Sequence, residues 1–81
     1  MYLHIGKEYV INNKEVIAIF NLEYIKNTKE YKKMYEQLEK NKAIINISKN
    51  QEKTFILTEK DGVKRGYLTN IAASTIGKRR M

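Results

Sequence analysis

The residues of this 81-residue chain that could do chemistry are mainly its cations. Sixteen lysines and arginines stand against nine acidic residues, which gives a formal net charge of +7. Residues 1–41 carry seven basic and six acidic side chains, whereas residues 42–81 carry nine basic and three acidic ones. Nearly all of the excess charge therefore belongs to the second half. A basic field of this kind attracts polyanions, nucleic acid first and an anionic membrane surface second.

The cations of the second half fall in three places: a loop, a turn and the C-terminal tail. They are Lys42, Lys49 and Lys53 in the loop, Lys60, Lys64 and Arg65 at the turn, and Lys78, Arg79 and Arg80 in the tail. Two other interpretations stay open. Basic charge can serve solubility alone, and cations at the end of a helix can simply complement its dipole.

Catalytic and metal chemistry have little support in the sequence. The single histidine, His4, lies among apolar strand residues without a carboxylate nearby in sequence, and Ser74 and Thr75 lack a base partner. Cysteine is absent, so a disulfide scaffold and a thiolate zinc site are excluded. The four glycines form no phosphate-binding loop motif. We expect a non-enzyme without cofactor, metal or small-molecule substrate.

Length and composition predict one small folded domain spanning residues 1–81. Apolar residues make up 42% of the chain and aromatic residues 10%, which is enough for a modest core. The longest apolar run, residues 16–20, is far too short to span a membrane, and the N-terminus lacks the pattern of a signal peptide. We expect a soluble, cytoplasmic protein with no membrane partner.

The elements that position the cations begin with strands. Residues 2–5 and 9–11 predict two short strands, paired as a hairpin because turn residues separate them. Residues 16–20 form a continuous β-branched run without polar alternation, which is typical of a strand covered on both faces. We expect that strand at the centre of the sheet. Residues 43–47 predict one more short strand.

The main helix is predicted over residues 28–41, with Asn27 as its N-cap. Its apolar residues recur at helical spacing and form one stripe, made of Tyr31, Met34, Tyr35 and Leu38. A second, short helix is predicted over about residues 70–77, capped by Asn70 and ended by Gly77 in a left-handed conformation. The short basic tail follows it.

The strongest local signal is Asp61-Gly62, which favours a two-residue type I′ turn between strands 54–60 and 63–69. Closing the hairpin there pairs Lys60 with Val63 and Glu59 with Lys64. Alternation then puts Phe55, Leu57 and Leu68 on one face, and Ile56 and Tyr67 on the other. The whole pattern predicts an α+β fold: a small antiparallel sheet of four to six strands with one main helix and one short one.

Assembly follows from the amount of apolar surface. Both faces of the sheet carry apolar residues, and one amphipathic helix can cover only one of them. An exposed apolar face is unusual for a soluble monomer and marks an interface when present. We therefore expect a homo-oligomer, in which another subunit covers the second face.

Several short segments together resemble the RemA/RemB family of extracellular matrix regulators, and its RemB branch more than its RemA branch. They are Leu3-His4-Ile5-Gly6, Ile17-Ala18-Ile19-Phe20, Phe55-Ile56-Leu57-Thr58, Tyr67-Leu68-Thr69 and Ser74-Thr75-Ile76-Gly77-Lys78-Arg79. The resemblance spans nearly the whole chain. It implies a cytoplasmic DNA-binding regulator of biofilm matrix genes, and its RemA members assemble into rings that present repeated basic contacts to DNA.

In the RemA branch, arginines that contact DNA lie just before the long apolar strand and in the loop before the hairpin. Here Lys14 stands nearest to the first place, and the second holds Lys49 and Lys53 without any arginine. Lysine keeps the charge but lacks the bidentate fork of arginine. The resemblance thus adds Lys14 to the candidate DNA contacts.

The sequence therefore predicts a non-enzymatic, oligomeric transcription regulator that binds double-stranded DNA mainly through phosphates. The candidate contacts are Lys14, Lys49, Lys53, Lys64, Arg65, Lys78, Arg79 and Arg80. Two alternatives remain: a protein-interaction or scaffold oligomer whose charge serves solubility, and an RNA-binding module that would use some of the six tyrosines as stacking platforms.

Overall fold

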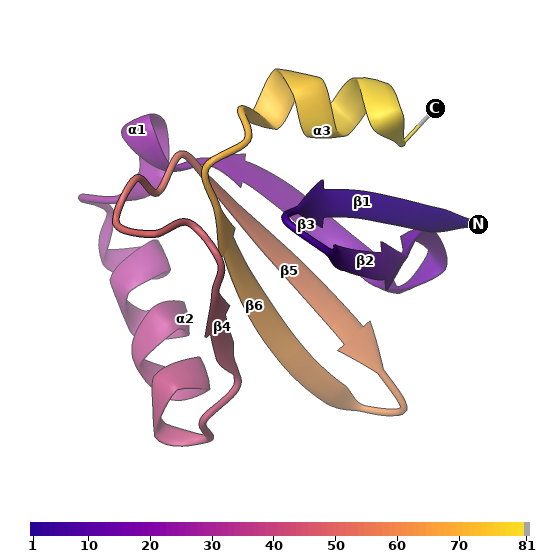
Figure 1. The fold of residues 1–81 in the computed structure, drawn as a ribbon. Helices are drawn as coiled ribbons and strands as arrows, with labels where there is room; N and C mark the ends of the chain where they lie inside the picture. The colour runs from indigo at the N-terminus through magenta and orange to yellow at the C-terminus, as the bar shows by residue number, and fades with distance from the viewer. Residues whose placement is uncertain (81) are drawn as a thin grey trace.

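The computed structural model describes residues 1–80 as two small sheets and three α-helices (Figure 1). In chain order the elements are β1 (Tyr2–Gly6), β2 (Tyr9–Asn12), the short 3₁₀ turn η1 (Asn13–Glu15), β3 (Val16–Asn21), α1 (Leu22–Ile25), α2 (Lys29–Lys40), β4 (Ile44–Asn46), β5 (Thr54–Lys60), β6 (Val63–Thr69) and α3 (Ala73–Arg79). The α+β class is confirmed. Within residues 1–80, no helix is both long and apolar enough to cross a membrane.

The main sheet has the strand order β3-β5-β6-β4, and β1 and β2 form a separate two-stranded ribbon. Strand β5 is antiparallel to β3 and to β6, but β4 is parallel to β6, so the sheet is mixed and not purely antiparallel. The reason is the long connection through α1 and α2, which returns the chain to the other edge of the sheet in the direction of β3.

The prediction that residues 16–20 form the centre of the sheet is wrong, because β3 is an edge strand. Its apolar run reflects cover on its faces: Ala18 and Phe20 pack with the core under α2, and Ile19 packs with the core on the other side. Cover on both faces is compatible with an edge position, so the pattern could not fix the strand order.

The β5–β6 hairpin confirms the predicted pairs Lys60 with Val63 and Glu59 with Lys64, and the same register continues to Phe55 with Leu68. Asp61 and Gly62 both have positive φ angles, 53° and 81°, as a type I′ turn requires. The first hairpin, β1 with β2, is also confirmed.

On one face of the sheet, α2 packs over Phe55, Leu57 and Leu68. The ring of Tyr31 meets that of Phe55 edge-on, with 5.4 Å between the ring centroids. Burial, with smaller contributions from Tyr35 and Glu52, raises the pKa of Tyr31 to about 12. Gly66 lets the ring of Phe55 approach the backbone of β6 closely, because a Cβ there would sit 2.4 Å from the Cζ atom of Phe55.

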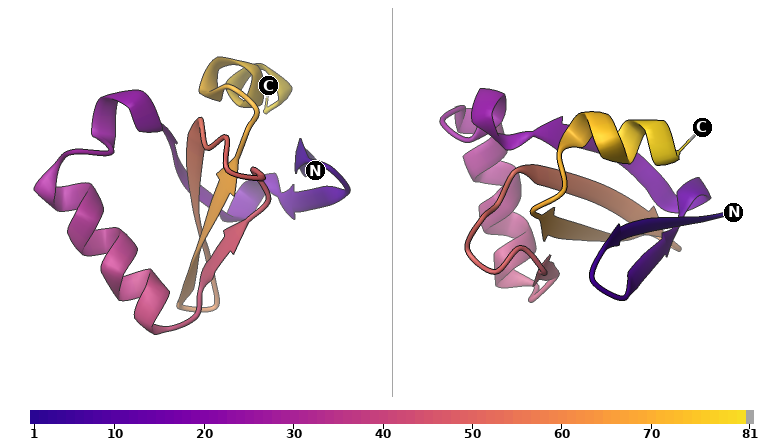
Figure 2. Two further views of the ribbon diagram at one scale, coloured as in Figure 1. Left: turned by 60° about the vertical axis from the view of Figure 1, so that its left-hand side comes forward. Right: turned by 45° about the horizontal axis from the view of Figure 1, so that its top comes forward.

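On the other face, the β1–β2 ribbon and α3 cover the sheet (Figure 2). Leu3 and Ile5 of the ribbon and Ile76 of α3 are almost completely buried there, against Ile56. The expectation that this face needs another subunit is therefore wrong: the chain covers it with its own N- and C-terminal segments. The large apolar side chains that stay exposed, such as Tyr2, Tyr24 and Val63, lie outside this covered face.

The helix ends differ from the prediction by one to three residues. Thr28, not Asn27, caps α2, since its Oγ1 accepts a hydrogen bond from the N–H of Tyr31 at 3.2 Å. Helix α3 begins after Ala72 without a side-chain cap and includes Gly77, so neither Asn70 nor Gly77 has its predicted role. Thr54 and Thr69 hold the backbone of Ile71 by hydrogen bonds, which keeps residues 70–72 outside the helix.

Candidate nucleic-acid interface

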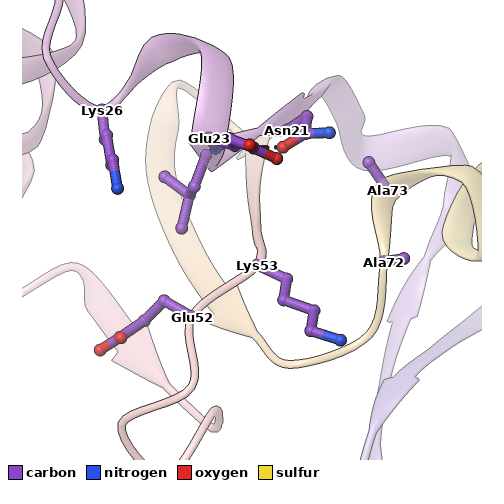
Figure 3. A pocket seen from close by; sticks show the side chains of 8 residues that line it. Asn21, Glu23, Lys26, Glu52, Lys53, Ala72 and Ala73 are labelled. Carbon is purple, nitrogen blue, oxygen red and sulfur yellow. Dashed lines mark hydrogen bonds between the residues drawn. The ribbon is translucent and has the colours of Figure 1, made fainter.

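Lys53 lies where three segments meet at the start of β5. Its N–H donates to the carbonyl of Thr69 at 2.9 Å, and its carbonyl accepts from the N–H of Leu22 at 3.0 Å. The backbone is thereby fixed on both sides. Its exposed side chain lines a pocket of about 350 Å³ together with Lys26, the C-cap of α1. Figure 3 shows the amine of Lys53 reaching toward Ala72.

Lys49 belongs to the same loop, four residues before Lys53. The loop is anchored by Ser48, whose N–H and hydroxyl both donate to Oδ1 of Asn46. Ser48 is fully buried, whereas Lys49 and Asn50 are exposed and adopt left-handed backbone conformations with φ of 54° and 70°. Two adjacent residues other than glycine in this region are uncommon. The anchored turn thus leaves Lys49 exposed directly after a buried residue.

We call Lys26, Lys49 and Lys53 the loop cluster. Within residues 1–80, none of the three forms an ion pair. Glu23 and Glu52 line the pocket beside Lys26 and Lys53, so acids border these two lysines without forming a direct ion pair with them. Lys26 was absent from the sequence-based candidates. The sequence gives little indication that Lys26 belongs here, because α1 is only one turn long. The backbone hydrogen bond between Leu22 and Lys53 brings Lys26 to the loop.

The C-terminal arginines are engaged within the chain. Nε of Arg80 donates to Oδ1 of Asn13 at 2.8 Å, and one of its terminal nitrogens lies 3.5 Å from the carbonyl oxygen of Val16. A terminal nitrogen of Arg79 donates to the carbonyl of His4 at 3.2 Å. These contacts hold the end of α3 against the β1–β2 ribbon and η1.

His4 is a satisfied strand histidine, as its sequence context indicates. Its Nε2 donates to the carbonyl of Lys7, which leaves Nδ1 as an acceptor 3.5 Å from Arg79. No group of three His, Asp or Glu side chains gathers as a metal site in the described part of the chain. The position of His4 supports a structural role.

Lys14 joins the tail residues in space. It lies on η1 directly after Asn13, the partner of Arg80, and its side chain is exposed. We call Lys14, Lys78, Arg79 and Arg80 the tail corner. The structure thus brings together predicted DNA contacts from opposite ends of the sequence, at one end of β3.

The two cations of the β6 turn, Lys64 and Arg65, do not act as one site. They are adjacent and exposed on a strand, so their side chains point to opposite faces of the sheet. Nearby, Lys60 lies 4.0 Å from Glu15, an ion pair between the tip of the hairpin and η1.

The loop cluster and the tail corner lie at opposite ends of β3. Asn21, next to the loop cluster, pairs with Thr54, while Val16, next to the tail corner, pairs with Thr58. Four strand residues span about 13 Å. Within one subunit, six of the eight predicted DNA contacts therefore lie in two separate basic regions, and Lys64 and Arg65 on β6 belong to neither.

Comparison with known protein families identifies the family to which the chain belongs. A sequence model of RemA-like proteins, described as extracellular matrix regulatory protein A-like, matches residues 2–79. The chain belongs to the RemA-like family. The match does not distinguish a RemB-like branch within that family. A search of curated proteins found no match.

Proposed function

We propose that this RemA-like protein is a non-enzymatic, cytoplasmic regulator of extracellular matrix genes that acts as a homo-oligomer on double-stranded DNA. The observation that carries the proposal is the loop cluster. Lys26, Lys49 and Lys53 are exposed and form no ion pair within residues 1–80. Membership of a family of matrix regulators supplies the biological setting.

The loop cluster suits phosphate contacts better than base recognition. A lysine amine is a mobile point charge, whereas recognition of guanine or bidentate contact with phosphate favours the planar fork of arginine. The helices add little base-reading capacity. The exposed side of α2 alternates lysine and glutamate, including the pair Glu36–Lys40, and α1 has only four residues. Binding should follow the backbone and shape of the duplex.

Repetition compensates for the weakness of each site. Three lysines in one subunit make few phosphate contacts, but several linked copies bind one duplex with raised effective concentration. Among residues 1–80, seven exposed large apolar side chains support self-association, including Tyr2, Val10 and Ile17. The family resemblance points the same way.

The proposal is tested by titrating labelled duplex DNA with the purified protein at 50 mM salt, with single-stranded RNA of equal length as competitor. We expect duplex binding that RNA competes for poorly. Preferential binding of RNA would favour a role for exposed tyrosines such as Tyr24, which is 78% exposed. Absence of binding to either polymer by an intact oligomer would favour a scaffold function.

A further inference from the structure

Two pockets adjoin each other where α1 and α2 face the loop before β5. The first, which we call the lysine pocket, is the pocket of about 350 Å³ that Lys53 lines. The second, which we call the tyrosine pocket, has a volume of about 330 Å³ and is lined by Tyr31 and Tyr35 of α2. The two pockets share three lining residues, Leu22, Lys26 and Glu52. Sites for small molecules usually enclose about 300–1,000 Å³, so the pair is large enough for one.

The two pockets differ in the chemistry of their walls. Lys26 and Lys53 give the lysine pocket two exposed amines, against the single carboxylate of Glu23. The tyrosine pocket offers two half-buried aromatic rings, those of Tyr31 and Tyr35, with 5.9 Å between their centroids. Since Lys26 lines both pockets, a ligand whose anionic group reaches its amine can place a second, planar group against the rings.

The carboxylate of Glu52 lies between the amines and the rings. Figure 3 shows the side chain of Glu52 on the opposite side of the loop from that of Lys53. Its Oε1 accepts a hydrogen bond from Nδ2 of Asn46 at 3.2 Å, which orients the carboxylate. An ionised carboxylate can accept about four hydrogen bonds, so this bond uses only part of its capacity. Glu52 can therefore accept from a ligand as well.

The hydroxyls of Tyr31 and Tyr35 stay protonated beside this carboxylate. Burial raises the pKa of Tyr35, and Glu39 and Glu52 add to the effect. Burial also raises the pKa of Tyr31, to about 12, with additions from Tyr35 and Glu52. Both hydroxyls can thus donate hydrogen bonds at neutral pH. The wall of the tyrosine pocket combines rings, donors and one acceptor of negative charge.

We propose that the two pockets together bind a free guanine nucleotide, with its phosphate at Lys26 and Lys53 and its base in the tyrosine pocket. Aromatic side chains stack on nucleobases, and an amine binds phosphate as a point charge. Guanine carries adjacent N–H donors on one edge, which the carboxylate of Glu52 can accept as a pair. Adenine lacks this pair, so the site should favour guanine.

Such a ligand would occupy two of the amines that we propose to contact DNA. Lys26 and Lys53 belong to the loop cluster, and a bound phosphate would cancel part of their positive charge. Duplex binding should therefore weaken when the nucleotide is present. This consequence rests on the proposed function, whereas binding of the nucleotide itself does not.

The first test titrates the full chain with GMP, AMP, guanosine and inorganic phosphate by calorimetry at constant ionic strength. We expect GMP to bind about tenfold more tightly than each of the others, because GMP alone offers both the phosphate and the paired donors. Equal binding of GMP and AMP, or of GMP and phosphate, would overturn recognition of guanine. Tighter binding of a single-stranded guanine pentanucleotide than of GMP would overturn a free nucleotide as the ligand.

The second test compares Lys26→Ala with Lys49→Ala. Both lysines are exposed members of the loop cluster, but Lys49 lines neither pocket. We expect Lys26→Ala to weaken GMP binding about fivefold or more, because it removes a charged contact with the phosphate. Lys49→Ala should leave GMP binding unchanged. An equal loss in both variants would reduce the effect to general charge and overturn the site.

The third test uses Glu52→Gln, which keeps an oxygen for the hydrogen bond with Asn46. We expect this variant to lose the preference for GMP over AMP. Glu8→Gln is the control, because Glu8 is exposed in the turn between β1 and β2 and its change removes the same charge. A preference for GMP that survives in Glu52→Gln would contradict the role of the carboxylate in recognising guanine.

Duplex titrations with and without GMP separate this inference from the proposed function. We expect saturating GMP to weaken duplex binding, and inorganic phosphate at equal ionic strength to have less effect. If the chain binds GMP but no duplex, the proposed function fails and the nucleotide site stands. If the chain binds duplex but no GMP at about 10 mM, far above any useful affinity, the nucleotide site is overturned and the proposed function stands.

Discussion

The loop cluster and the tail corner carry similar charge but use it in different ways. In the loop cluster, the backbone of Lys53 is fixed by two hydrogen bonds while its side chain reaches into a pocket. In the tail corner, Arg79 and Arg80 use their guanidinium groups to bind His4, Asn13 and Val16. In the loop cluster, backbone hydrogen bonds fix the chain and the charged side chains stay accessible. In the tail corner, the charged side chains of Arg79 and Arg80 themselves fix the chain.

This difference teaches that the number of cations is not the number of DNA contacts. A charge without a partner is free to neutralise a phosphate and release a counterion. An arginine with carbonyl or amide partners keeps its charge but has fewer donors left for a ligand. Electrostatic binding should therefore depend most on the loop cluster, and stability should depend most on the tail corner.

The largest expected effect is on DNA affinity after reversal of the loop charges. The double variant Lys49→Glu/Lys53→Glu should weaken duplex binding about 10- to 100-fold at 50 mM salt, because two attractive phosphate interactions become repulsive. Its urea midpoint should stay near that of the wild type. A matched reversal, Lys32→Glu/Lys33→Glu on the exposed side of α2, controls for net charge. An equal fall in affinity in both variants would remove the special role of the loop.

A smaller effect, on stability, is expected for Arg80→Ala. The change removes the 2.8 Å hydrogen bond to Asn13 and the contact with Val16, and charged hydrogen bonds contribute about 1.5–3 kcal/mol each where buried. Arg80 is partly exposed, so we expect a decrease of about 1–2 kcal/mol in the free energy of urea-induced unfolding. Lys78→Ala, at an exposed neighbouring position, serves as the control. If Lys78→Ala destabilised the chain as much, the contacts of Arg80 would not be the cause.

The smallest effect is expected for Arg79→Ala. Arg79 is exposed, and its contacts with His4 are 3.2 and 3.5 Å long. We expect a decrease of less than about 1 kcal/mol in unfolding free energy, since solvent weakens such contacts. Thermal melting of the wild type, Arg79→Ala and Arg80→Ala in parallel shows which variant is destabilised more. A larger destabilisation by Arg79→Ala than by Arg80→Ala would mean that α3 is attached mainly to the β1–β2 ribbon and not to η1.

Local features of the fold were predictable from the sequence. Asp61-Gly62 determines both the turn and the register of the β5–β6 hairpin, because the residues that set the pairing are neighbours in the chain. The period of Tyr31, Met34, Tyr35 and Leu38 likewise located α2. Such signals depend on a few consecutive residues.

Features that depend on distant contacts were not predictable in this way. The edge position of β3 depends on the order of the strands in the sheet, and the apolar pattern of β3 would be the same at the edge or in the centre. The start of α3 is delayed by hydrogen bonds from Thr54 and Thr69. Arg80 meets Asn13 across 67 residues, and Lys26 reaches the loop cluster through the contact of Leu22 with Lys53. The cations could be found from sequence, but not their division into two regions.

The most direct test of DNA binding by the loop cluster is the salt dependence of duplex affinity, measured by fluorescence anisotropy between 50 and 300 mM salt. We expect the logarithm of the affinity to fall linearly with the logarithm of the salt concentration. In Lys49→Ala/Lys53→Ala the slope should become shallower by about 0.9 for each phosphate that is no longer neutralised. An affinity independent of salt, or an identical slope in the double variant, would contradict it.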